Sequence, residues 1–141
     1  ANHARATWLK AASASLIGFG VVIALAALPA TAGPTEFMVD LVLGPIDRAA
    51  NAADPETRLL RAICGGLLVG WGTMLWLLVD RLLPRDPALV RSLILPGIGI
   101  WFVVDSLGSI AAGAPLNAAL NVAFLLAFVL PLWRPGHAAR A

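Results

Sequence analysis

The sequence contains few residues that could carry chemistry of their own. Cys64 is its single cysteine, so neither an internal disulfide nor a thiolate metal cluster is available. Tyrosine is absent, and the two histidines, His3 and His137, lie in the terminal segments. No predicted membrane span therefore holds a histidine, which argues against a haem or pigment carrier with histidine ligands. Because no phosphate-binding loop, metal-ligand spacing or nucleophile–base signature is present either, we expect no cofactor, no metal and no enzymatic activity.

Charge is also scarce. Charged residues make up 13% of the 141 residues, whereas 60% are hydrophobic and the mean hydropathy is +0.85. A soluble domain typically has about 25% charged and about 45–50% apolar residues. The composition therefore predicts an integral membrane protein with one membrane domain, 1–141, and no separate soluble domain. The net charge of +2 is too small to indicate nucleic acid, so the expected partners are membrane lipids and other membrane-protein subunits or copies of this chain.

Four long apolar segments predict an all-α fold, an integral membrane four-helix bundle. Each is about long enough to cross a hydrocarbon core of roughly 30 Å. We place the spans at about residues 11–32, 58–79, 89–112 and 116–133. The 33–57 connection is polar and acidic, and its 35–43 portion is amphipathic, which predicts a short helix lying along the membrane surface.

The segment before residue 33 admits two interpretations. It resembles a secretory signal with its cleavage site, because a basic start with Arg5 and Lys10 is followed by an apolar core and then by Ala30-Thr31-Ala32. The apolar core is also about long enough to span the membrane. We interpret the segment as a retained first helix.

The basic residues predict the orientation of the chain. Seven of the ten lie in the N-terminal lead, the 80–91 region and the C-terminal tail, all expected on one side of the membrane. These seven are Arg5, Lys10, Arg81, Arg85, Arg91, Arg134 and Arg140. Since basic loops favour the cytoplasmic side, both termini should lie in the cytoplasm of a bacterium and the 33–57 connection in the periplasm.

The 58–79 span is rich in glycine on the face that we expect to pack against other helices. Its glycines are Gly65, Gly66, Gly70 and Gly72. Small residues four positions apart, such as Gly66 and Gly70, allow helix backbones to approach closely in lipid. Packing within this bundle is the favoured interpretation, and a seam between two copies of the chain is the alternative.

Asp105 is the one ionisable residue in the interior of the 89–112 span. A carboxylate in a membrane span costs roughly 2.5–3.5 kcal/mol on insertion scales, so it usually faces protein or water. At about 1.5 Å of rise per residue, Asp105, Asn121 and Arg61 lie at a similar depth. We therefore expect a buried polar cluster with three further members: Ser106, Ser109 and Asn117. It is either a structural clasp that fixes helix register, a proton or cation relay or ligand anchor, or a carboxylate that opens to water.

Two tryptophans lie deeper in their predicted spans than the interfacial ones. Trp71 and Trp101 fall near the middle of the 58–79 and 89–112 spans. Core packing is the favoured role for both, and a lipid or quinone groove is the alternative. Cys64 is interpreted as a small packing residue.

The runs GGLLVGWGTMLWLL (65–78) and WFVVDSLGSIAAGAPLNAALNVAFLL (101–126) resemble the small four-helix bacterial inner-membrane proteins grouped loosely with the DoxX-like families. The resemblance covers the last three spans and implies a four-helix membrane bundle. DoxX-like relatives include a subunit of a quinone-linked sulfur oxidoreductase.

The leading hypothesis is a non-catalytic accessory or structural subunit of a respiratory or photosynthetic type of inner-membrane complex. The alternatives are a small transporter or channel that uses Asp105, and a quinone-linked redox subunit.

Overall fold

The computed structural model describes residues 2–44, 46 and 54–133, and nearly all of these described residues are helical. The elements are α1 (Asn2–Leu25), a short 3-10 turn η1 (Pro29–Thr31), α2 (Gly33–Leu43), α3 (Pro55–Arg81), α4 (Pro87–Ala111) and α5 (Pro115–Trp133). The four helices other than α2 are long and apolar enough to cross a membrane. The predicted all-α four-helix bundle is confirmed, and the chain is a multi-pass membrane protein.

Proline and capping residues determine where the long helices begin. α3 and α4 each start with a proline that follows an aspartate, Asp54 or Asp86. The proline lacks only a backbone N–H that would have no helical partner, and the aspartate side chain accepts the free N–H of the third helical residue, Thr57 or Leu89. Asp54 accepts hydrogen bonds from the backbone N–H and the hydroxyl of Thr57, both 2.9 Å long. These bonds lower the pKa of Asp54 below its ordinary value of 3.8, so the cap persists down to more acidic pH.

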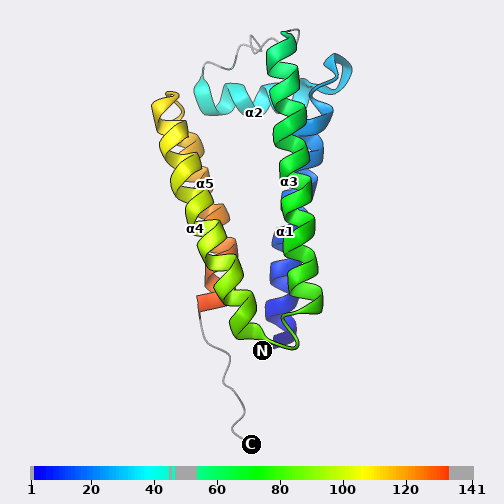
Figure 1. Ribbon diagram of the computed structural model, residues 1–141. Helices are drawn as coiled ribbons and strands as arrows, with labels where there is room; N and C mark the ends of the chain where they lie inside the picture. Colours follow the sequence, from blue (N-terminus) through cyan, green and yellow to red (C-terminus); the bar gives the residue numbers. More distant parts are fainter. Residues whose placement is uncertain (1, 45, 47–53, 134–141) are drawn as a thin grey trace, which may run out of the picture.

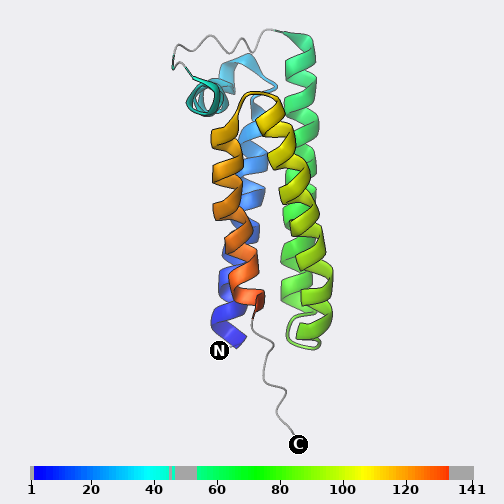
Figure 2. The same ribbon diagram turned by 90° about the vertical axis from the view of Figure 1, so that its left-hand side faces the viewer.

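The four long helices form two antiparallel pairs. α1 packs along α3, α4 packs along α5, and the pairs meet mainly through α1 and α5 (Figures 1 and 2). α3 and α4 lie close together at the end where the 82–86 turn joins them, and they diverge toward the other end (Figure 1). The short helix α2 lies crosswise at that other end, where it contacts α1 and α5.

The apolar core is concentrated in the half of the bundle where the pairs converge. Its buried residues come from the first two thirds of α1, the second half of α3 with the turn after it, the first half of α4 and the second half of α5. Its largest fully buried members are Phe128, Leu9, Ile94, Ile98 and Leu132. Polar contacts dominate the half nearer α2.

α1 and α3 approach so closely that glycine is required between them. A Cβ added to Gly65 would lie 2.4 Å from the backbone nitrogen of Ala24, and one added to Gly72 would lie 2.8 Å from Cγ1 of Ile17. Gly20 of α1 is enclosed in the same way by α3. Because lipid tails are as apolar as these helices, close van der Waals packing is what holds such a pair together.

Gly66 and Gly70 do not belong to this contact. Both are exposed, and a Cβ at either position would meet nothing within 4 Å. The prediction that they pack within the bundle is therefore wrong. Gly65 and Gly72 are seven residues apart and share one face of the helix, whereas at about 3.6 residues per turn positions 66 and 70 are rotated away from it. A seam between copies of the chain at these positions stays a prediction.

α1 begins and ends earlier than the 11–32 span. It is helical from Asn2 and stops at Leu25. Pro29 has no N–H to bond to the Leu25 carbonyl, and the Thr31 hydroxyl donates to that carbonyl instead, at 2.6 Å. The last turn of the expected span is therefore the η1 connection to α2.

A side chain of α1 replaces the hydrogen bond that a proline near the end of α5 cannot make. Pro131 lacks the N–H that would bond to the carbonyl of Ala127, four residues earlier. The indole Nε1 of Trp8 donates to this carbonyl at 2.9 Å. The start of α1 and the end of α5 are thereby joined by a hydrogen bond that exists because of the proline.

We expect Gly65→Leu to destabilise the protein by about 1–3 kcal/mol or more, because the side chain would force the α1 and α3 backbones apart. Gly66→Leu is the matched control, since the same side chain meets open space. Unfolding of the detergent-solubilised variants, followed by far-ultraviolet circular dichroism, measures the difference. Equal losses for the two variants would contradict the glycine contact.

Candidate functional site

Asp105 is the centre of a polar cluster between α4 and α5. Its Oδ1 accepts hydrogen bonds from the side-chain amides of Asn121 at 2.7 Å and Asn117 at 3.0 Å, and from the Ser109 hydroxyl at 3.2 Å. The Asn117 amide also reaches Ser109 Oγ at 2.8 Å, and the Asn121 amide reaches Ser106 Oγ at 3.3 Å. The structure thus brings together five of the six residues predicted for this cluster.

The cluster follows from the pattern of residues facing each other along the α4–α5 contact. On α5, Asn117, Asn121, Phe124 and Phe128 recur at intervals of four, three and four residues. This spacing keeps them on one side of a helix, as in a coiled-coil seam. The tight turn before α5, where Gly113 has a φ of +80°, makes α4 and α5 antiparallel neighbours. The polar part of the seam therefore lies next to the turn, and its aromatic part lies deeper.

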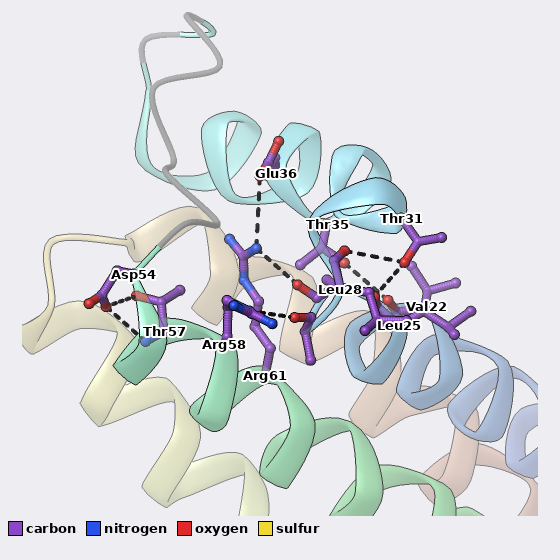
Figure 3. Close-up of polar contacts among 12 residues, drawn as sticks. Val22, Leu25, Leu28, Thr31, Thr35, Glu36, Asp54, Thr57, Arg58 and Arg61 are labelled. Atoms are coloured by element: carbon purple, nitrogen blue, oxygen red, sulfur yellow. Dashed lines mark hydrogen bonds and ion pairs between the residues drawn. The ribbon is translucent and has the colours of Figure 1, made fainter.

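Arg61, the sixth predicted member, is not beside Asp105. Its Nη1 lies 3.4 Å from the carbonyl oxygen of Ala26 and 3.9 Å from Oε1 of Glu36 (Figure 3). The prediction was wrong because equal depth does not determine direction. α3 is paired with α1, so the buried Arg61 side chain points to the end of α1 and to α2, away from α4.

Arg61 belongs to a second group of polar residues that surrounds the end of α1 (Figure 3). We call this group the arginine cap, and its members are Arg58, Arg61, Thr31 and Thr35. Arg58 Nε donates to the carbonyl of Ala27 at 2.7 Å, and Thr35 Oγ1 donates to that of Val22 at 3.3 Å. The last carbonyls of a helix have no helical partner and carry partial negative charge, which favours cationic donors there.

The arginine cap was missed at the sequence level because the first span was extended to residue 32. The signal that could have revealed it is Pro29, which cannot continue a helix and so leaves unpaired carbonyls before it. Those carbonyls need donors, and Arg58 and Arg61 are basic residues near the membrane surface on the same side. The 3.9 Å ion pair of Arg61 with Glu36 also fastens α2 to α3.

Trp71 and Trp101 contact each other across the convergence of α3 and α4. Their ring centroids are 5.8 Å apart, and Trp101 also packs against Phe124 of α5 at 5.4 Å. Neither tryptophan lines the depression on α3 between Gly70 and Leu82 or the one beside Trp8 and Pro131. Their geometry fits packing better than a lipid or quinone groove. Cys64, expected to be a packing residue, is exposed on α3.

The two oxygens of the Asp105 carboxyl differ, because only one of them accepts hydrogen bonds from the described residues. Three donors converge on Oδ1, whereas Oδ2 has no hydrogen bond or ion pair from any residue that the structure describes. All three donors are uncharged. Such an arrangement can hold a carboxyl in place between two helices. Among the described residues, no group of three or more His, Cys, Asp or Glu side chains is placed to hold a metal.

A double-mutant cycle tests the cluster and the separation of Arg61 from it. We expect Asp105→Asn and Asn121→Ala to be coupled by about 0.6–1.7 kcal/mol in the free energy of unfolding, the range found for hydrogen bonds between membrane helices. Asp105→Asn and Arg61→Gln should be additive within about 0.3–0.5 kcal/mol, because they belong to separate groups. Coupling between Asp105 and Arg61 of the larger size would show that the two side chains meet.

Compared with known proteins, the chain matches no family model, no curated protein and no solved structure. The DoxX-like resemblance therefore stays a prediction, and the function must be argued from the residues themselves.

Proposed function

We propose that this chain is a non-catalytic structural or accessory subunit of a bacterial inner-membrane complex. One observation carries the proposal: the polar side chains of the Asp105 cluster and of the arginine cap connect different helices or bind the end of a helix. The Asp105 cluster joins α4 to α5, and the arginine cap joins α3 and α2 to α1. Polar residues used in this way define a rigid helical scaffold.

The distribution of charge supports an orientation with both ends of the chain in the cytoplasm. Arg81, Arg85 and Arg91 lie near the 82–86 turn, at the same end of the bundle as the start of α1 and the end of α5 (Figure 1). Lys10 of α1 also lies near this end, where its Nζ binds the Asp80 carboxylate. An excess of basic residues marks the cytoplasmic side. α2 then lies at the periplasmic surface.

A transport role for Asp105 is the second candidate, and it is favoured by the open Oδ2 of its carboxyl. Ionisable residues inside membrane spans mark ion or proton pathways in many membrane proteins. The α4–α5 hairpin would supply the neutral donors that hold the carboxyl while a proton or cation exchanges at Oδ2.

Gentle extraction from native membranes, followed by mass spectrometry of the proteins that migrate with this chain, tests the subunit role. We expect defined membrane-protein subunits in a fixed ratio, because a scaffold without its own site acts through partners. A chain that runs alone as a monomer in mild detergent would contradict the proposal.

Flux measurements on proteoliposomes separate the two candidates. A transporter that depends on Asp105 should lose proton or cation flux at least tenfold in Asp105→Asn, which keeps the shape of the side chain. Asp80→Asn is the matched control at the membrane surface and should keep the flux. No flux in the unaltered protein, or flux that survives Asp105→Asn, removes the transport role.

A further inference from the structure

An open depression of about 470 Å³ lies on the flank of α3 that faces away from α1. Its lining consists of α3 residues and of Leu82, just after the helix. Gly70, Met74, Leu77 and Arg81 recur at intervals of four, three and four residues, which places them on a single face, and Thr73 and Leu78 also line it. A Cβ added to Gly70 would meet nothing within 4 Å, so no side chain covers the helix backbone at the inner end of the depression.

The wall of this depression is apolar except at one end. Met74 and Leu77 are 53% and 41% exposed, which presents their side chains to the surrounding lipid. The Thr73 hydroxyl donates to the Val69 carbonyl at 2.8 Å within the helix, so its polar group is already used. Arg81 alone contributes a charged group to the lining.

The length of the depression matches one leaflet of a membrane. Gly70 and Arg81 are eleven positions apart, which at about 1.5 Å per residue corresponds to about 16 Å. This is close to half of a hydrocarbon core of about 30 Å. The apolar part therefore extends from the membrane surface near Arg81 to about the middle of the bilayer.

Two guanidinium groups are placed at the surface end. Arg85 Nη1 donates to the Arg81 backbone carbonyl at 2.9 Å, which holds its side chain beside Arg81. The neighbouring carboxylate of Asp80 is bound by Lys10, 2.5 Å away. Within the described residues the Arg81 guanidinium makes no hydrogen bond or ion pair, so it is available to an anion.

We propose that this depression is a binding site for an anionic phospholipid. One acyl chain lies along α3 from Leu77 to Gly70, and the phosphate is bound by Arg81 and Arg85. An apolar helix flank one leaflet long, with Arg81 at its end and Arg85 beside Arg81, is complementary to this lipid in length and charge. The site does not depend on the subunit role proposed above.

The charge of the site is tested by titrating the delipidated protein in detergent with phosphatidylglycerol and with phosphatidylcholine of the same acyl chains. Native mass spectrometry gives the Kd of each lipid. We expect phosphatidylglycerol to bind more tightly, and Arg81→Gln to weaken it about fivefold, equivalent to about 1 kcal/mol. Phosphatidylcholine binding should not change. Arg91→Gln, which removes the same charge at the same end of the bundle but outside the depression, should leave both Kd values unchanged.

The apolar part of the depression is tested separately with Gly70→Leu. This variant should weaken both lipids, whereas Gly66→Leu, at an equally open position that does not line the depression, should weaken neither. Equal affinity for the two lipids, or equal effects of Arg81→Gln and Arg91→Gln, would overturn the proposal. So would binding of glycerophosphoglycerol as tight as that of the whole lipid, or a change of oligomeric mass instead of lipid occupancy in Gly70→Leu. Circular dichroism of each variant verifies that its helices are intact.

Discussion

The backbone contact between α1 and α3 determines the rest of the arrangement. Gly65 and Gly72 face α1 at distances that no side chain would allow, and this determines how α3 is rotated about its own axis. With that rotation, Arg61 points to the end of α1, and Gly70 points outward to the lipid. Arg61 of the arginine cap and the apolar depression therefore lie on opposite faces of α3, and one contact determines both directions.

The polar side chains divide according to the pair of helices that they connect. At the end of α1, cationic donors compensate carbonyls that the helix cannot use, so the charge is balanced by a helix dipole and by Glu36. Between α4 and α5, the carboxyl of Asp105 is balanced by neutral donors alone. The first arrangement caps the end of helix α1, whereas the second lies in the contact between two membrane-spanning helices.

The sequence was sufficient for the features that depend on local chemistry and on depth. The predicted spans and the rise per residue put Asp105 and Asn121 at one level, and the two side chains meet because α4 and α5 form an antiparallel hairpin. It was insufficient where the direction of a side chain around the helix axis matters. Arg61 was placed at the correct depth and on the wrong side. The spacing of Gly66 and Gly70 matches a packing motif, but the position of α1 decides which glycines of α3 are in contact with it.

Trp8 fixes the depth of α1 and α5 relative to each other and to the membrane surface. Its indole donates to a carbonyl of α5 that is 119 positions away in sequence, and more than half of its surface stays exposed. Tryptophan side chains prefer the boundary between headgroups and hydrocarbon. A single indole thus registers the first and the last helix with each other and with the bilayer. Any vertical displacement of either helix has to move both of them relative to the lipid headgroups.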